Sequence, residues 1–364
     1  MKKQFILMLV ILCLFLIVSC KRNVTDNETI KLGALAPLSG PLAYFGGEMK
    51  QGFDLAIEEI NNKGGINGKQ IKLVYEDEKC DPKETITALN KLKNFDEVIG
   101  FVGPFCGSSI QVSAEFSQAN NLIGISPDTN FGRLSEKYFS IRGLLELEDK
   151  SLAEYAYGKL GLRNINVFYY NNYYGVQYKE GFKKHFEALG GNVALAEGFL
   201  PSELNDFKTQ MLKLTQNADG LFIVFGAPGN ILNQIKELDI SIQVLGIEGV
   251  DNENTLNVAK ESVEGLVFAE TKVNVDDGFN NRFKEKYGEE ALIWNANSYD
   301  SLMLLKYLFE ECGNFETKCA AERMKSLRNY KGAGGTITFN AETWDTGKTY
   351  GIKVIKNGKA EWVN

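Results

Sequence analysis

The chain has 364 residues, enough for two domains that each enclose a sizeable core, and its 44% apolar and 24% charged residues are ordinary for a globular protein. The net charge of −7 comes without any basic stripe, which argues against nucleic acid as a partner. A single histidine, His185, makes a histidine-based metal site or catalytic triad a poor starting hypothesis.

The chain begins with a targeting segment. Two lysines precede an uncharged apolar run, residues 5–18, which is too short to favour a membrane-spanning helix. The run ends in "IVSC", where a small residue before Cys20 resembles a bacterial lipobox. Residues 1–19 would then be a signal peptide and Cys20 the lipidated mature N-terminus, with an ordinary secretory cleavage site as the alternative. Residues 20–29 are polar and aperiodic, which predicts a flexible tether.

From residue 30 onward, apolar strands alternate with helical patterns. Strands are predicted at 30–38, 70–77, 98–103, 122–126, 165–170, 192–200, 220–226, 243–249 and 265–270. Helices are predicted around 49–60, 83–95, 108–120, 176–189, 230–238, 277–287 and 297–311. The chain closes with a strand at 335–340 and a hairpin at 351–363, whose turn is Asn357-Gly358. Repeated β-α units predict an α/β protein with parallel, doubly wound sheets in two similar lobes.

The stretch "VGPFCGSSIQ", residues 102–111, joins a predicted strand to a predicted helix. In open parallel sheets, ligands bind beyond the carboxyl ends of the strands, so such junctions are candidate binding loops. Gly103 and Gly107 would let the backbone approach a ligand closely. Ser108 lies where a helix N-terminus offers unbonded amides to an anion.

Cysteine usage supports export. Cys13 lies in the expected signal peptide, and the four cysteines beyond Cys20 form an even set, which implies disulfides with three possible pairings. The set is Cys80, Cys106, Cys312 and Cys319. The last two are seven residues apart and could close one small loop, which would leave the first two to each other. Zinc is the rival interpretation, although no pair has C-x-x-C spacing and no histidine is nearby.

Several motifs resemble one family when taken in order. They are "LGALAPLSGPLAYFGGEMKQGFDLAIEEINNKGGINGKQIKLVYEDEKCDPKE", "GPFCGSSIQ", "ISPDTN", "NNYYG" and "GIEGV". Together they resemble the type I periplasmic binding proteins for branched-chain amino acids, over residues 30–364. The resemblance implies two doubly wound lobes joined by three crossover segments, with a small solute bound between them and delivered to an ABC permease. It implies no cofactor, no metal and no covalent chemistry.

The resemblance also implies how the chain is divided. One lobe would comprise residues 30–145 plus 271–340, and the other 146–270 plus 341–364. The cysteines in "EKCDPK" and "GPFCGS" match the family's paired cysteines, which supports a Cys80–Cys106 disulfide beside the ligand loop.

The implied ligand site has a carboxylate side on the first lobe. The family's serine and threonine fall on Gly107 and Asn130, while Ser108 is retained, so backbone amides at these positions would bind a carboxylate. Asp128 and Thr129 depart from the family's small residues. Asp128 would either add a negative charge, which favours a cationic or amine-bearing ligand, or only cap the following turn.

The rest of the implied site draws on both lobes. Glu248 matches the acidic residue that pairs with the ligand's ammonium, with a solvated loop glutamate as the alternative. Tyr174, Phe45 and Phe105 match aromatic or apolar pocket positions, and ordinary core packing is the alternative for each. Ala227 and Asn297 stand where some members have tyrosines, which predicts a roomier or more polar pocket than leucine requires.

Three classes of function follow. The first is an exported solute-binding lipoprotein, anchored through Cys20 at the outer face of the cytoplasmic membrane or in the periplasm, for an amino acid or an amide, urea or amine. The second is a ligand-sensing receptor component on the same fold. An enzyme is disfavoured, because no G-x-S-x-G, P-loop or G-x-G-x-x-G motif follows a strand and His185 lies among lysines in a surface pattern.

Overall fold

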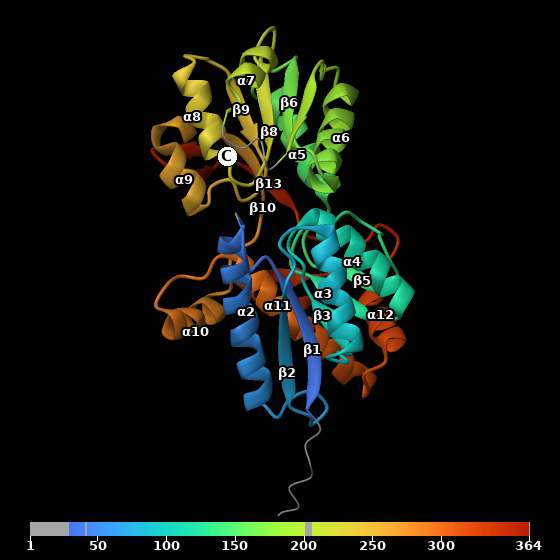
Figure 1. Ribbon diagram of the computed structural model, residues 1–364. Helices are drawn as coiled ribbons and strands as arrows, with labels where there is room; N and C mark the ends of the chain where they lie inside the picture. The colour runs from blue at the N-terminus through green and yellow to red at the C-terminus, as the bar shows by residue number, and fades with distance from the viewer. Residues whose placement is uncertain (1–28, 41, 201–205, 364) are drawn as a thin grey trace, which may run out of the picture.

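The computed structural model describes residues 29–40, 42–200 and 206–363. The expected signal peptide and the lipidation site at Cys20 lie outside the described residues. Figure 1 shows two α/β lobes, one above the other, with the first half of the chain contributing to both. None of the helices in the described part of the chain combines the length and apolarity that crossing a membrane requires.

The first lobe is built on a five-stranded sheet in the order β2-β1-β3-β4-β5, and every neighbouring pair is parallel. The strands are β1 (Ile30–Ala36), β2 (Ile71–Asp77), β3 (Gly100–Val102), β4 (Ile123–Ser126) and β5 (Tyr138–Ser140). The helices are α2 (Ala43–Asn62), α3 (Pro82–Asn94), α4 (Gly107–Asn120), α10 (Asp277–Tyr287), α11 (Ile293–Cys312) and α12 (Thr317–Lys325). A small ribbon pairs β11 (Tyr330–Gly332) with β12 (Gly335–Ile337).

The second lobe is built on a seven-stranded sheet in the order β14-β13-β10-β9-β8-β6-β7. The strands are β6 (Ile165–Tyr170), β7 (Ala196–Phe199), β8 (Gly220–Val224), β9 (Gln243–Gly246), β10 (Val267–Thr271), β13 (Tyr350–Lys356) and β14 (Lys359–Trp362). The helices are α5 (Leu145–Gly158), α6 (Tyr173–Ala188), α7 (Lys208–Leu214), α8 (Gly229–Glu237) and α9 (Glu253–Ala259), the last followed by the 3₁₀ turn η2 (Lys260–Val263). The antiparallel β13–β14 hairpin turns at Asn357 and Gly358, both with positive φ.

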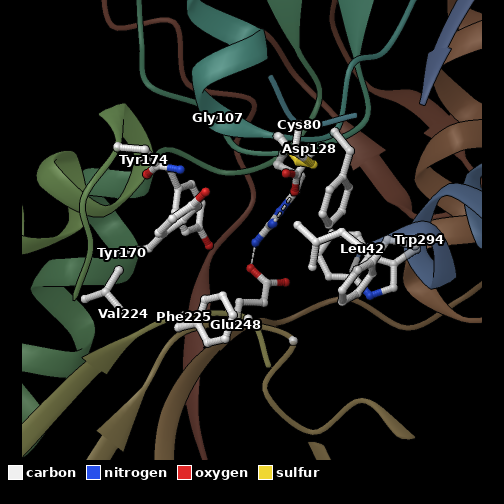
Figure 2. A pocket seen from close by; sticks show the side chains of 17 residues that line it. Leu42, Cys80, Gly107, Asp128, Tyr170, Tyr174, Val224, Phe225, Glu248 and Trp294 are labelled. Carbon is white, nitrogen blue, oxygen red and sulfur yellow. Dashed lines mark hydrogen bonds and ion pairs between the residues drawn. A yellow bond between two sulfur atoms is a disulfide. The ribbon is translucent and has the colours of Figure 1, made fainter. Parts of the chain in front are cut away.

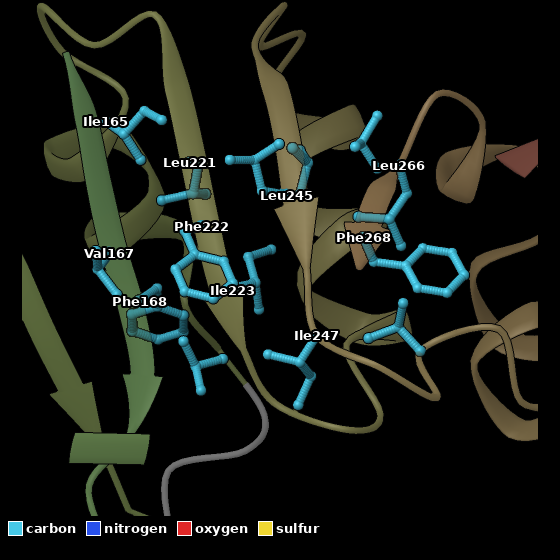
Figure 3. Close-up of a cluster of buried hydrophobic side chains, with 14 of the residues drawn as sticks. Ile165, Val167, Phe168, Leu221, Phe222, Ile223, Leu245, Ile247, Leu266 and Phe268 are labelled. Atoms are coloured by element: carbon cyan, nitrogen blue, oxygen red, sulfur yellow. The ribbon is translucent and has the colours of Figure 1, made fainter. Parts of the chain in front are cut away.

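These sheets confirm the predicted α/β class with parallel sheets. Both faces of a parallel sheet are covered by helices, so its strands become continuous apolar runs that can be read from the sequence. In β8 all five residues are buried, and Figure 3 shows Leu221, Phe222 and Ile223 packed among the side chains of neighbouring strands. The prediction missed α5 and β5, which lie around the first passage between the lobes, and it also missed the short elements α7, α9, α12 and β11.

The chain passes between the lobes at residues 141–144, 272–276 and 338–349, and these three segments form the hinge. The Nδ2 atom of Asn130 donates to the carbonyl oxygens of Arg142 and Trp344, at 3.1 and 2.9 Å. The Thr346 hydroxyl donates to the same Arg142 oxygen at 2.8 Å, and the Tyr350 hydroxyl bonds the Gly143 carbonyl. The first and third segments are thus joined by buried side-chain hydrogen bonds.

Candidate functional site

A cavity of about 80 Å³ lies between the lobes, where the carboxyl ends of strands from both sheets meet. Such strand ends are where open parallel sheets bind ligands. Figure 2 shows Asp128 and Glu248 facing the same space, with Tyr170 and Tyr174 on one side and Trp294 on the other. A larger cavity of about 340 Å³ adjoins it and shares Leu42, Cys80, Tyr170 and Phe225 with its lining.

The first-lobe side of the cavity is formed by the loop that enters α4. The amides of Phe105 and Cys106 donate to Oε1 of Glu78, each at 3.3 Å, and the Ser109 hydroxyl bonds the other carboxylate oxygen. Glu78 is fully buried, and burial raises its pKa to about 7 against these hydrogen bonds. Within the described residues no acceptor is recorded for the amides of Gly107 and Ser108, which begin α4 and remain available to an anion.

A disulfide joins Cys80 to Cys106 at this loop, the pairing that the resemblance implied, and a second joins Cys312 to Cys319. Glu78, Cys80 and Cys106 are close enough together to suggest a metal site. Disulfide formation consumes both thiolates, which are the species that bind metal. This cluster is therefore a covalent brace for the loop and does not act as a zinc site.

A buried ion-pair cluster spans the cavity. Nη1 of Arg142 lies 2.8 Å from Oδ1 of Asp128, and Nη2 contacts Oε2 of Glu248. The exposed fractions of these side chains are only 4%, 5% and 1%. Asp128 follows β4 in the first lobe, Glu248 follows β9 in the second, and Arg142 belongs to the hinge. The cluster therefore links the two lobes through one guanidinium.

Arg142, Tyr170 and Phe225 line the cavity, but the sequence interpretation singled out none of them, and Arg142 is the charged one. Its only local signal was a lone arginine in "FSIRG", at a point where a passage between lobes was expected. The sequence interpretation gave Asp128 and Glu248 a cationic ligand as partner, whereas the structure supplies the cation from the chain itself. Asp128 therefore acts as an ion-pair partner in this structure, in addition to accepting a bond from the Thr129 hydroxyl.

Burial also raises the pKa values of acidic residues near Arg142. Burial raises the pKa of Glu148 to about 8, although Arg142 lies 4.0 Å away and the Tyr178 hydroxyl donates to the carboxylate at 2.9 Å. Burial also raises the pKa of Asp128, opposed by its pairing with Arg142. Burial thus disfavours the charged form of Glu148, and Asp128 and Glu248 make the shorter contacts with Arg142.

Aromatic rings form much of the remaining wall. Phe45 and Phe105 stack with centroids 4.7 Å apart, and Trp294 meets both edge-on at 5.7 and 5.5 Å. The Arg142 guanidinium lies 5.2 Å from the Trp294 ring, within the range of cation–π attraction. Across the cavity, Tyr174 packs on Tyr178. The walls therefore suit an apolar or aromatic group on the ligand.

Gly107 in the first lobe lies directly against Tyr174 of the second lobe. A Cβ atom there would lie 2.7 Å from Cβ of Tyr174 in the second lobe and 2.8 Å from Cζ of Phe131. Real Cβ atoms do not tolerate such distances, so any larger residue would have to push the lobes or these rings apart. The turn therefore requires glycine at this position, because the second lobe packs against its backbone and leaves no room for a side chain.

The predicted site residues fall into three groups. Those that line the cavity are Phe45, Phe105, Gly107, Asp128, Tyr174 and Glu248. Ala227 lines the adjoining larger cavity. Those outside the lining are Ser108, Thr129, Asn130 and Asn297.

Two of the outlying residues have structural partners that explain their position. The Asn130 side chain is committed to the hinge carbonyls and to the amide of Gly132. Asn297 lies on the buried face of α11, where its Oδ1 accepts a bond from Nζ of Lys348 at 3.2 Å. These side chains hold the hinge region together, away from the cavity.

Comparison with known proteins agrees with this architecture. The family model described as "Periplasmic binding protein" matches residues 29–359. A leucine-, isoleucine-, valine-, threonine- and alanine-binding protein of Pseudomonas aeruginosa is 27% identical over 325 residues, 86% of each chain. The Leu/Ile/Val-binding protein of Escherichia coli is 29% identical over 259 residues, 69% of this chain and 70% of that protein.

Solved structures show the same similarity in three dimensions. A leucine-binding protein from Thermotoga maritima superposes with a TM-score of 0.83 at 25% identity, covering 92% of this chain and 98% of the other. A branched-chain amino acid transporter substrate-binding protein from Streptococcus pneumoniae, solved with isoleucine, gives 0.80 at 25% identity, covering 92% and 99%. These relatives are binding proteins and not enzymes. Together with the fold and the interlobe cavity, they show that the chain belongs to the type I periplasmic binding proteins of the leucine/isoleucine/valine-binding family.

Proposed function

We propose that this chain captures a small amino acid or amino-acid-like solute in the interlobe cavity and presents it to an ABC permease. The observation that carries the proposal is the convergence of unbonded α4 amides, buried charged groups and aromatic walls on one small cavity between two hinged lobes. The relatives from Escherichia coli and Streptococcus pneumoniae, by their names, bind branched-chain amino acids or serve their transporter. No covalent chemistry is needed for this role.

We expect the ligand to contact the residues that line the cavity. Gly107 and its neighbour Ser108 would offer amides to a ligand carboxylate. Phe45, Phe105 and Tyr174 would contact its side chain. Closing the lobes would bury the ligand, and the permease would respond to the closed form.

The mature protein is further proposed to be a lipoprotein. Cleavage before Cys20 would remove residues 1–19, and lipid on Cys20 would hold the chain at the outer face of the cytoplasmic membrane. Residues 20–29 would form a tether that spans at most roughly 35 Å. Confinement near the membrane raises the effective concentration at the permease. Replacing Cys20→Ser should release the exported protein from the membrane fraction, whereas continued membrane association would contradict the anchor.

A thermal-shift screen tests ligand capture. The mature protein is heated with amino acids, their amides and analogues, and small amines. A ligand at 100-fold excess over Kd raises the free energy of unfolding by about 2.7 kcal/mol. If the ligand carries an ammonium that pairs with Glu248, Glu248→Gln should weaken its binding by about tenfold or more, or about 1.4 kcal/mol. Stabilisation by none of these compounds would contradict the proposed function.

A further inference from the structure

Both carboxylate oxygens of Glu248 already have partners within the protein. Its Oε1 accepts the Thr271 hydroxyl at 2.8 Å, and its Oε2 contacts Nη2 of Arg142 and accepts a second contact from the same hydroxyl at 3.0 Å. The side chain is buried, so water cannot substitute for a lost partner. Arg142 therefore occupies the place at Glu248 that the sequence interpretation assigned to a ligand ammonium.

Displacing Arg142 from Glu248 would be unfavourable. The guanidinium is buried on a main chain that the hinge holds, since the Arg142 carbonyl accepts bonds from Asn130 and Thr346. An arriving ammonium would leave this cation with Asp128 as its remaining close acidic partner, and removing one partner from a buried ion pair is strongly destabilising. A ligand without an ammonium leaves the cluster intact.

Two other groups at the cavity are hydrogen-bond donors, namely the Arg142 Nε atom and the amides that begin α4. Nε of Arg142 is buried and has no hydrogen-bond partner among the described residues, and Arg142 lines the cavity. The amides at the start of α4 lie on the same cavity through Gly107. A guanidinium and a helix N-terminus both favour a carboxylate. The negative charge of Asp128 opposes an anion, and burial, which raises the pKa of Asp128, lessens that opposition.

We propose that Arg142 determines specificity by occupying the ammonium position, so that the ligand is an amino-acid-like monocarboxylate without an α-amino group, such as a 2-oxo acid with a branched or aromatic side chain. This inference rests on the proposed function, of which it names the ligand class. The aromatic wall of Phe45, Phe105 and Trp294 accommodates the side chain, and Arg142 with the α4 amides binds the carboxylate.

Matched pairs of compounds test the inference on the full mature protein. L-leucine is compared with 4-methyl-2-oxopentanoate, and L-phenylalanine with phenylpyruvate, by isothermal titration calorimetry and thermal shift. The expected result is that at least one oxo acid binds about tenfold or more tightly than its amino acid. Tighter binding of the amino acid in every pair that binds would overturn the inference and leave the proposed function standing. If neither these compounds nor the wider screen of amino acids, amides and amines binds, both fail.

Substitution of Arg142 provides a second test of its role in specificity. Arg142→Lys keeps a positive charge, but a single ammonium lacks the planar fork that bridges Asp128 and Glu248. The oxo acid should then bind about tenfold more weakly, while affinity for the amino acid stays equal or rises. Arg282→Lys, on the exposed face of α10, serves as the matched control. Equal weakening of both ligands by Arg142→Lys would contradict a role in specificity. If that variant does not fold, the selectivity of the unsubstituted protein still decides.

Discussion

The two rims of the cavity occupy equivalent places in their lobes but are held differently. The first-lobe rim is braced by the Cys80–Cys106 disulfide and by the buried carboxylate of Glu78, which bonds two successive loop amides. The second-lobe rim has no disulfide within the described residues: Asn172 caps α6, Asn252 donates to the carbonyls of Gly226 and Gly249, and the amide of Glu248 donates to the carboxylate of Glu148. A fixed rim presents amides in a set geometry, while an uncrosslinked rim can adjust when the lobes close.

Removing the Cys80–Cys106 disulfide should abolish this difference between the rims and should have the largest effect on stability. Cys80→Ser with Cys106→Ser opens a loop of 26 residues, which should lower the free energy of unfolding by about 3 kcal/mol. Ligand affinity should fall as well, because the α4 loop loses its brace. Thermal denaturation and calorimetric titration measure the two effects.

The second disulfide is the matched control. Cys312→Ser with Cys319→Ser removes a bridge with a separation of only 7 residues, at the end of α11 and away from the cavity lining. Stability should fall less, and affinity should be unchanged. Equal loss of affinity in both double variants, or four unpaired thiols in the exported protein by mass spectrometry, would remove the bracing role.

The next largest expected effect comes from a substitution at Gly107, where the two rims lie against each other. Gly107→Ala places a Cβ atom against Tyr174 and should weaken ligand binding by about tenfold, or 1.4 kcal/mol, because the lobes cannot fully close. Gly226→Ala is the control on the opposite rim, where a Cβ atom meets nothing within 4 Å. Ligand-induced compaction by small-angle scattering should be lost only in the first variant. Unaltered compaction in Gly107→Ala would show that closure does not depend on this contact.

The smallest effect concerns pH. The pKa of Glu78 is raised to about 7, so in this range the folded protein holds a proton that the unfolded chain releases near 4.5. Stability from this group is therefore greatest at low pH and is lost as pH rises from about 4.5 to 7. Glu78→Gln should flatten the decline of the melting temperature between pH 5 and 8, because this position then no longer binds or releases a proton. Glu84→Gln, at an exposed glutamate, is the control and should leave the pH dependence of the melting temperature unaltered. If Glu78→Gln also leaves this dependence unaltered, Glu78 is excluded as its source.

Local patterns predicted most of the fold because they depend on short stretches of chain. The apolar runs of β1 and β8 and the Asn357-Gly358 turn carry their structure in neighbouring residues. The helix α5 was not predicted because Glu148 and Asp149 lie on its buried side. These charged residues interrupt the helical spacing of apolar residues on which the prediction relies. The three-residue strand β5 is too short to show any period.

The site was harder to predict than the fold. The family motifs led to Gly107 and Glu248, whose loops do meet at the cavity. The role of Arg142 depends on acids that come from two other loops, in different lobes, and no local pattern records that meeting. The hinge contacts of the Asn130 side chain could not be predicted for the same reason, because its partner Trp344 in the third passage is distant in sequence, and the proposed role of the Asn130 amide stays a prediction.

The route of the chain has a consequence for biogenesis. The sheet of the second lobe gains its last two strands, β13 and β14, only from the final residues, and α2 of the first lobe packs against α11, far along the sequence. Neither lobe can therefore be completed until nearly the whole chain is available, so folding of both halves waits for late segments and late truncation should damage both.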